Sequence, residues 1–160
     1  MNKTDLLARI IERLGVDLDV AQRAAQTAYE AATAEENIAE NKYDTLGLEA
    51  SYLATGQARR MEEIRQARLA YQQLTLRDYD PEAGVQLSNL VLLGDEQDRQ
   101  QRVFLGPEAA GLKIGEGQAL ITVITPRSPL GQSLMGKLEG DEVVLVLGNG
   151  RQVYELVEVL

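Results

Sequence analysis

The chain has 160 residues, with 16 Lys and Arg against 25 Asp and Glu, a formal net charge of −9, and neither Cys nor His. The missing residue types exclude disulfides, thiolate nucleophiles, metal sites ligated by cysteine or histidine, and every catalytic site that needs an imidazole base. The acidic balance opposes nonspecific contact with duplex nucleic acid, because charges of the same sign repel.

The first quarter of the chain carries apolar residues at alternating spacings of four and three, which is typical of a coiled-coil strand. Asn2 or Thr4 can cap this helix, which is expected to run to about Thr33. No stretch resembles a signal peptide or approaches the length of a membrane span, so we expect a cytoplasmic protein. The positions of this apolar seam are Leu7, Ile11, Leu14, Leu18, Ala21, Ala25, Ala28 and Ala32.

The same rhythm resumes at Leu46 and predicts a second helix that runs to Leu74. The two runs are separated by a short polar segment, and closing so short a loop costs less than associating two chains. The pattern therefore favours an antiparallel hairpin over residues 1–76, with an acidic tip near residues 35–44, although a parallel dimer is the alternative. The predicted seam of the second helix is Leu46, Ala50, Leu53, Gln57, Arg60, Ile64, Ala67, Tyr71 and Leu74.

Residues 77–84 break the helical period with Pro81 and Gly84 and predict a linker. Strands are predicted beyond it at 87–93, 99–105, 120–125, 142–147 and 152–159. One short helix is predicted between them, with Ser128 as its cap and Pro129 at its first position. The fold class is therefore α+β: a helical hairpin followed, over residues 85–160, by an antiparallel sheet with one short helix.

Two motifs resemble the Gre transcript-cleavage factors of bacterial RNA polymerase (the GreA/GreB family). One is Asn-Ile-Ala-Glu-Asn at 37–41, followed by Tyr43, and the other combines Ser-Pro-Leu-Gly-Gln-Ser-Leu-Met-Gly-Lys at 128–137 with Gly-Asp-Glu-Val at 140–143. The second motif is the more specific. The resemblance implies a coiled-coil hairpin joined to an FKBP-like domain, in a family member or a divergent paralogue.

The resemblance further implies a transcription elongation factor that is accessory to core RNA polymerase and is not itself an enzyme. In the family, the globular domain docks on the rim of the secondary channel, and the hairpin tip reaches the active centre near the 3′ end of the nascent RNA. Tip carboxylates there share a catalytic Mg²⁺ with the polymerase, since Mg²⁺ prefers oxygen ligands. We expect a monomer that binds no cofactor alone, no membrane and no specific DNA sequence.

Carried over residue by residue, the catalytic positions are Glu40, Asn37 and Glu36, and the metal positions, which act only with the polymerase, are Glu40 and Glu36. The family has an aspartate where this chain has Asn37. An amide oxygen adds no negative charge for Mg²⁺, so cleavage is expected to be impaired, with Glu36 as the nearest substitute. A solvated acidic turn that keeps the hairpin soluble is the alternative for the whole tip.

Two further groups of residues resemble functional regions of the family. The partner-binding positions are Ser128, Pro129 and Arg127, the last standing where the family commonly has an acidic or amide residue. A basic patch near RNA is expected at Arg59, Arg60, Arg65 and Arg68, because guanidinium groups bind phosphate. A solvated helix face, paired with Glu62 and Glu63, explains these arginines equally well.

Two other function classes are left open by the sequence. A coiled-coil adaptor would bind or dimerise through the hairpin and would not need the tip acids. A prolyl isomerase of the FKBP type would need an apolar pocket lined by aromatic side chains. The second half of the chain offers only Tyr79, Phe104 and Tyr154 for that purpose, so this activity is the least favoured.

Overall fold

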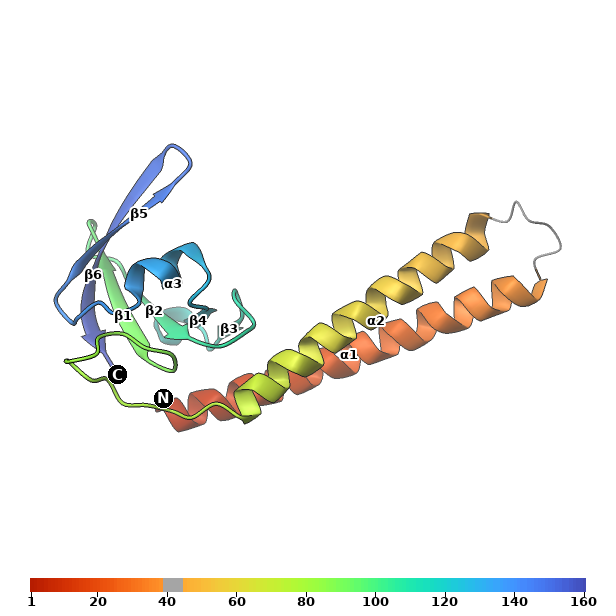
Figure 1. Cartoon of the computed structure of the whole chain (residues 1–160), viewed down its shortest axis with the longest axis horizontal. Coiled ribbons are helices and arrows are strands. Elements are labelled where there is room, and N and C mark those ends of the chain that lie inside the picture. Colours follow the sequence, from red (N-terminus) through yellow and green to blue (C-terminus); the bar gives the residue numbers. More distant parts are fainter. Residues whose placement is uncertain (39–44) are drawn as a thin grey trace. The chain divides into compact units, whose positions relative to one another are not determined.

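The computed structural model describes the backbone of residues 1–38 and 45–160, and the side chains of residues 1–34, 49 and 51–160 (Figure 1). The chain forms two compact units, one of Ile11–Leu69 and one of Met1–Ile10 with Ala70–Leu160. We name them the hairpin unit and the sheet unit. Within the described residues, no helix has the length and apolar character needed to cross a membrane.

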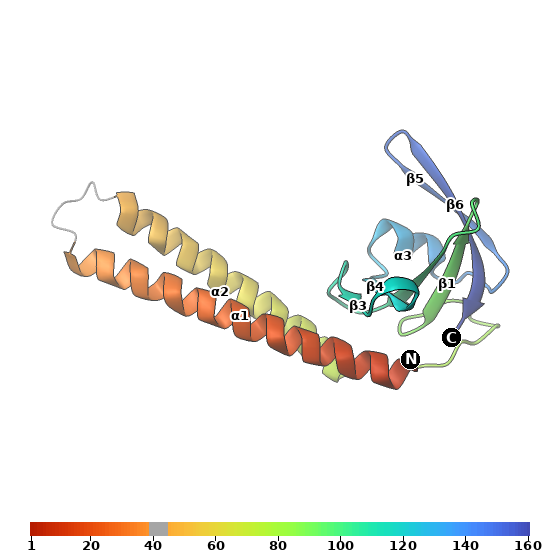
Figure 2. The ribbon, with the colours of Figure 1, turned by 180° about the vertical axis from the view of Figure 1, so that it is seen from behind.

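The hairpin unit consists of most of α1 (Lys3–Ile38) and α2 (Thr45–Gln72), which run side by side (Figures 1 and 2). From Leu14 onward the predicted seam of α1 is confirmed, since Leu14, Ala21, Ala28 and Ala32 are buried and Leu18 and Ala25 are half-buried. At its start the prediction is wrong by one residue, because Leu6 and Ile10 are fully buried whereas the predicted Leu7 and Ile11 are half-buried. The helix continues past Thr33 because no proline or glycine interrupts the sequence there.

The seam of α2 differs from the prediction at two positions. Leu53 is 57% exposed and Arg60 is also exposed, whereas Ala54 and Met61 are half-buried. Spacings of three and four leave every second seam position uncertain by one residue, because 3.6 residues per turn match neither spacing. The prediction placed Leu53 and Arg60 in the seam. In the structure, the neighbouring Ala54 and Met61 face α1 instead.

The sheet unit contains six strands in the order β3-β4-β2-β1-β6-β5. Their bounds are β1 (Leu90–Asp95), β2 (Gln100–Leu105), β3 (Lys113–Ile114), β4 (Ile121–Ile124), β5 (Glu142–Leu147) and β6 (Gly150–Val159). A 3-10 turn, Gly117–Ala119, precedes β4, and the helix α3 (Pro129–Leu134) follows it.

The prediction of a wholly antiparallel sheet is wrong at one pair of strands. β2 and β4 are parallel, with Arg102 opposite Ile121 and Leu105 opposite Ile124. The chain leaves β2, forms β3 and the 3-10 turn, and re-enters the sheet as β4 in the direction of β2, so that β3 is the antiparallel neighbour of β4. The sheet is therefore mixed, because a connection of this length permits a crossover.

Apolar side chains are buried on both faces of the sheet. On one face, Val91, Leu93, Val103 and Leu156 form a cluster that includes Leu134 of α3. Leu90 and Phe104, which are paired across β1 and β2, are buried on the other face. Leu6, Ile10 and Tyr71 are also fully buried in this unit, so the first turns of α1 and the last turn of α2 contribute to its core.

Candidate functional site

The predicted tip lies at the limit of what the structure describes. Glu40 is outside the described residues, and Glu36 and Asn37 belong to α1 but their side chains are outside the description. Their catalytic and metal-binding roles therefore stay predictions. Elsewhere, in the part of the chain whose side chains are described, no three acidic residues are grouped so as to hold a metal ion.

The predicted start of α3 is confirmed in detail. Ser128 has extended backbone angles, and its Oγ accepts a hydrogen bond from the Gly131 N–H at 3.2 Å and donates one to the Thr125 carbonyl at 2.7 Å. Pro129 follows at the first helical position, where no N–H is needed. A Cβ at position 131 would lie 1.8 Å from Thr125 O, so only glycine fits there.

Arg127 lies next to this cap and projects into solvent, with 73% of its side chain exposed. Its Nη2 is 3.2 Å from Oε2 of Glu108, and its carbonyl accepts a hydrogen bond from the Gln132 amide. An ion pair this exposed contributes little free energy, so the guanidinium can exchange partners readily. Arg127, Ser128 and Pro129 thus present one cation and a rigid helix start at the surface.

Glu108 also makes a contact that sequence reasoning missed. The Tyr71 hydroxyl, near the end of α2, donates a hydrogen bond to the Glu108 carbonyl at 2.7 Å, and burial raises the pKa of Tyr71. A Cβ at Gly106 would lie 2.0 Å from that hydroxyl, so this glycine makes room for the phenol. No local pattern signals the contact, since 37 residues separate its partners.

The predicted linker is fixed by hydrogen bonds inside the sheet unit. Lys3 Nζ donates to the carbonyls of Arg77 and Ser88, and burial lowers the pKa of Lys3. The Arg77 N–H donates to Ser88 Oγ at 2.8 Å, and the Asn89 amide donates to the Arg77 carbonyl at 3.2 Å. Ser88 and Asn89 are buried, so these bonds satisfy polar groups that would otherwise be unpaired.

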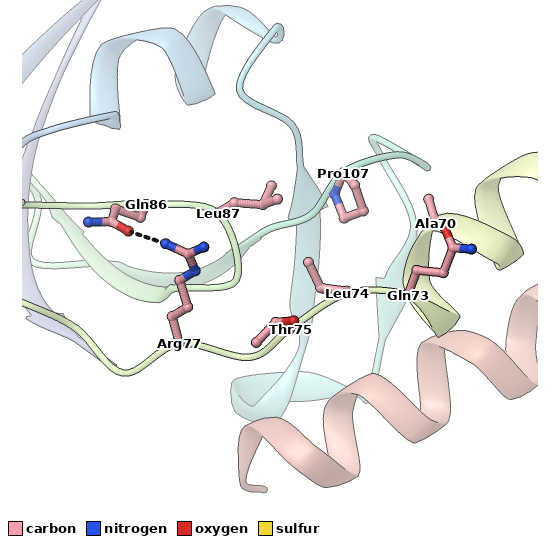
Figure 3. A pocket seen from close by; sticks show the side chains of 8 residues that line it. All are labelled: Ala70, Gln73, Leu74, Thr75, Arg77, Gln86, Leu87 and Pro107. Atoms are coloured by element: carbon pink, nitrogen blue, oxygen red, sulfur yellow. Dashed lines mark hydrogen bonds between the residues drawn. The ribbon is translucent and has the colours of Figure 1, made fainter.

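A cavity of about 510 Å³ opens beside this linker (Figure 3). The Arg77 guanidinium lies on one side of it, where Nη1 is 3.5 Å from Oε1 of Gln86. The cavity combines apolar and polar side chains, and none of its lining residues is a carboxylate. Its lining residues are Ala70, Gln73, Leu74, Thr75, Arg77, Gln86, Leu87 and Pro107.

The four arginines of α2 do not share one face. A helix turns about 100° per residue, so Arg59 and Arg60 point in directions different from those of Arg65 and Arg68. Arg65 pairs with Glu62 at 2.6 Å, and the Arg68 guanidinium lies against Gly15 of α1. Arg68 Nε is buried with no hydrogen-bond partner among the described residues, so Arg68 belongs to the seam and not to an exposed patch.

The second half of the chain gives no support to a prolyl isomerase site. Phe104 is fully buried and therefore lines no cavity, and the hydroxyl of Tyr79 accepts a hydrogen bond from the Glu139 N–H. Within the described residues, Tyr154 lines a cavity of about 190 Å³ whose other lining residues are mostly polar or charged. Among the described residues, these three aromatic side chains therefore do not come together around one apolar pocket.

Solved structures to which this chain is similar include three proteins of the Gre type. GreA factor homolog 1 (Gfh1) of Thermus thermophilus is 18% identical, with 94% of each chain covered and a TM-score of 0.40. Gfh1 of Thermus aquaticus is 22% identical, with 92% of each chain covered and a TM-score of 0.39. The GreA/GreB elongation factor from Nitrosomonas europaea is 19% identical over 60% of this chain and 78% of that one, with a TM-score of 0.37.

No curated protein matches this chain. Residues 81–160, half of the chain, match the family described as transcription elongation factor GreA/GreB, C-terminal domain. The matched segment contains all six strands, β1 to β6, together with the Ser128 cap and α3. The chain therefore belongs to the GreA/GreB family of transcription elongation factors, which are accessory to RNA polymerase.

Proposed function

We propose that this chain binds core RNA polymerase through its sheet unit and extends the helical hairpin into the secondary channel, where it modulates elongation. The observation that carries the proposal is the family match over residues 81–160. A helix of 36 residues such as α1 is roughly 54 Å long, which is a suitable length for a hairpin that enters a channel.

Polymerase docking is assigned in this proposal to Arg127, Ser128 and Pro129. Arg127 is held only by an exposed ion pair with Glu108, so a carboxylate of the polymerase can replace Glu108 at little cost. The Ser128 cap and Pro129 hold the adjacent backbone rigid, which lowers the entropy lost on binding. The exposed Arg59 and Arg60 of α2 are the side chains we assign to RNA phosphates.

At the tip, we assign Glu40 and Glu36 to the Mg²⁺ that the polymerase active centre shares with its accessory factors. Carboxylate oxygens are suitable donors for this ion, which would activate water for hydrolysis of the RNA end. Asn37 would offer a neutral amide oxygen in place of the carboxylate that the family has at this position. We therefore favour a factor that occupies the channel and tunes elongation with little transcript cleavage.

Copurification with bacterial core RNA polymerase tests the docking step. The full chain is expected to bind, and Arg127→Glu is expected to weaken binding by about tenfold, because a surface carboxylate would face the carboxylate of the partner. Lys113→Glu is the matched control, since it makes the same charge change on an exposed strand of the same unit. A chain that fails to bind polymerase and dimerises through its helices would instead be a coiled-coil adaptor.

A backtracked elongation complex tests the tip. The natural chain should bind and cleave little RNA, and Asn37→Asp should raise cleavage because it restores a charged ligand for Mg²⁺. Robust cleavage by the natural chain that Glu40→Gln abolishes would contradict the noncleaving assignment. An Asn37→Asp chain that binds polymerase without any gain in cleavage would show that the tip does not reach the metal.

A further inference from the structure

The two edges of the sheet are protected to very different degrees. β3, at one edge, is two residues long and begins with Lys113, and short charged edge strands resist pairing with other chains. β5, at the other edge, is six residues long and contains no Pro, Lys or Arg. Its register with β6 is continuous from Glu142 to Leu147, without a bulge. Apart from the charge of Glu142 at its first position, the usual protections of an edge strand are therefore missing from β5.

The backbone of β5 presents unpaired groups to the solvent. Leu147 and Gly150 flank a two-residue turn in which Gly148 has φ 58°. In a hairpin with such a turn, the two flanking residues form a hydrogen-bonded pair through their backbone groups. Antiparallel ladders alternate, so the N–H and C=O groups of Glu142, Val144 and Val146 point away from β6. Among the described residues, no hydrogen bond reaches these outward groups.

The side chains next to this edge are apolar and exposed. Val144 is 43% exposed, Val146 68% and Leu147 50%, whereas the alternate residues Val143 and Leu145 are buried. Residues 150–153 of β6 pair only with β5, so the turn end of the β5–β6 pair is a two-stranded ribbon that extends beyond β1 (Figures 1 and 2). An isolated two-stranded ribbon is marginally stable, and a third strand would stabilise it.

We propose that β5 is a self-association surface, on which β5 of a second copy of this chain adds in antiparallel register about a two-fold axis. Leu145 would face its own copy, and Val144 of each chain would face Val146 of the other. In this register the outward backbone groups of Val144 and Val146 bond one another, which gives four hydrogen bonds between the chains. Glu142 would face Gly148, so no two like charges are directly opposite.

Charge along the ribbon favours the second copy over another occupant. Glu142 is paired with Glu155 at one end of the ribbon, and Arg151 is paired with Val146 toward the turn. Antiparallel addition of a second copy brings the positive end of each ribbon toward the negative end of the other. A contact of six residues buries less than about 1,200 Å², so the dimer is weak and forms at high protein concentration. The proposal does not depend on polymerase binding.

Sedimentation of the full chain from about 10 µM to about 1 mM tests the proposal, and a concentration-dependent dimer is expected. Val144→Lys combined with Val146→Lys should weaken self-association by at least about tenfold, because like charges would then be opposite each other twice. Val144→Glu combined with Val146→Glu should do the same. Circular dichroism checks that both variants fold.

Mixing the two like-charged variants distinguishes this register from any other contact. A heterodimer should form, since every Lys would face a Glu across the β5 pair. Val157→Lys is the matched control, because Val157 is 38% exposed on β6 and not on the edge, and it should leave self-association unchanged. A natural chain that is monomeric at every concentration, a mixture that stays monomeric, or a loss from Val157→Lys equal to that from the edge variants would overturn the proposal.

Discussion

The sheet unit and the hairpin unit are stabilised by different kinds of contact. Large side chains such as Leu93, Phe104 and Val123 are fully buried in the sheet unit. The hairpin unit is joined by the buried Leu14, several alanines and half-buried residues, with the Arg68 guanidinium packed against Gly15. Buried area per residue sets most of the stabilisation, so the sheet unit should tolerate fewer substitutions than the hairpin unit.

Truncating one core side chain in each unit should give the largest effects, and the sheet unit should lose more stability than the hairpin unit. Phe104→Ala should lower the free energy of unfolding of the sheet unit by about 4 kcal/mol, because it leaves a cavity in a fully packed layer. Leu14→Ala, at a seam position that is 4% exposed, should cost the hairpin unit about 2 kcal/mol, since two helices can relax into the gap.

Native-state hydrogen exchange with urea measures both losses, because it reports each unit separately. If Leu14→Ala destabilises its unit as much as Phe104→Ala destabilises the sheet, the seam is packed as tightly as the sheet core and the contrast fails.

A glycine in the sheet unit gives the next largest effect. Gly131→Ala should cost about 3 kcal/mol, because its Cβ would lie 1.8 Å from a backbone oxygen that cannot move without disturbing the Ser128 cap. Gly150→Ala is the matched control, since the nearest atom to its Cβ is Leu147 O at 3.4 Å. Thermal unfolding followed by circular dichroism measures both, and similar midpoints for the two variants would contradict the tight packing of α3.

The sequence predicted the parts of the sheet unit that rest on local chemistry. β5 was predicted with its observed bounds, and Ser128 and Pro129 were predicted as cap and first helical residue, because turn and cap residues act over a few positions. The direction of β4 was not predictable, since alternation of apolar residues shows which face is buried and carries no information on strand direction. The Tyr71 to Glu108 contact was missed because its partners are distant in sequence.

The hairpin was predicted in outline and less well in detail. Its two helices and the seam of α1 from Leu14 onward follow from the repeat. At the start of α1 the predicted seam is one residue off, and in α2 Leu53 and Arg60 were placed on the wrong side. In the candidate site, the residues at 127–129 could be read from their motif, but the pairing of Arg127 with Glu108 depends on the fold. The roles of Glu36, Asn37 and Glu40 still rest on the family resemblance.

Removing one hydroxyl should give a moderate loss in the sheet unit. Tyr71→Phe keeps the buried ring and leaves the Glu108 carbonyl without its donor, so it should lower the free energy of unfolding by about 1 kcal/mol. Tyr154→Phe removes an exposed hydroxyl that bonds Gln152 and should change stability by much less. Urea unfolding compares them, and equal effects would mean that the Tyr71 hydrogen bond contributes no more than a surface contact.

The smallest expected effects come from the two helical glycines of the hairpin unit. They test how loosely the two helices of this unit are packed. Nothing lies within 4 Å of a Cβ at Gly56, so Gly56→Ala should stabilise the hairpin by about 0.8 kcal/mol through backbone entropy alone. A Cβ at Gly15 would lie 3.3 Å from Arg68 Nη2, so Gly15→Ala must displace the guanidinium and should gain less. Hydrogen exchange in α1 and α2 measures both changes. If Gly15→Ala stabilises as much as Gly56→Ala, Arg68 adds nothing to the seam, and the hairpin unit is held by its apolar residues alone.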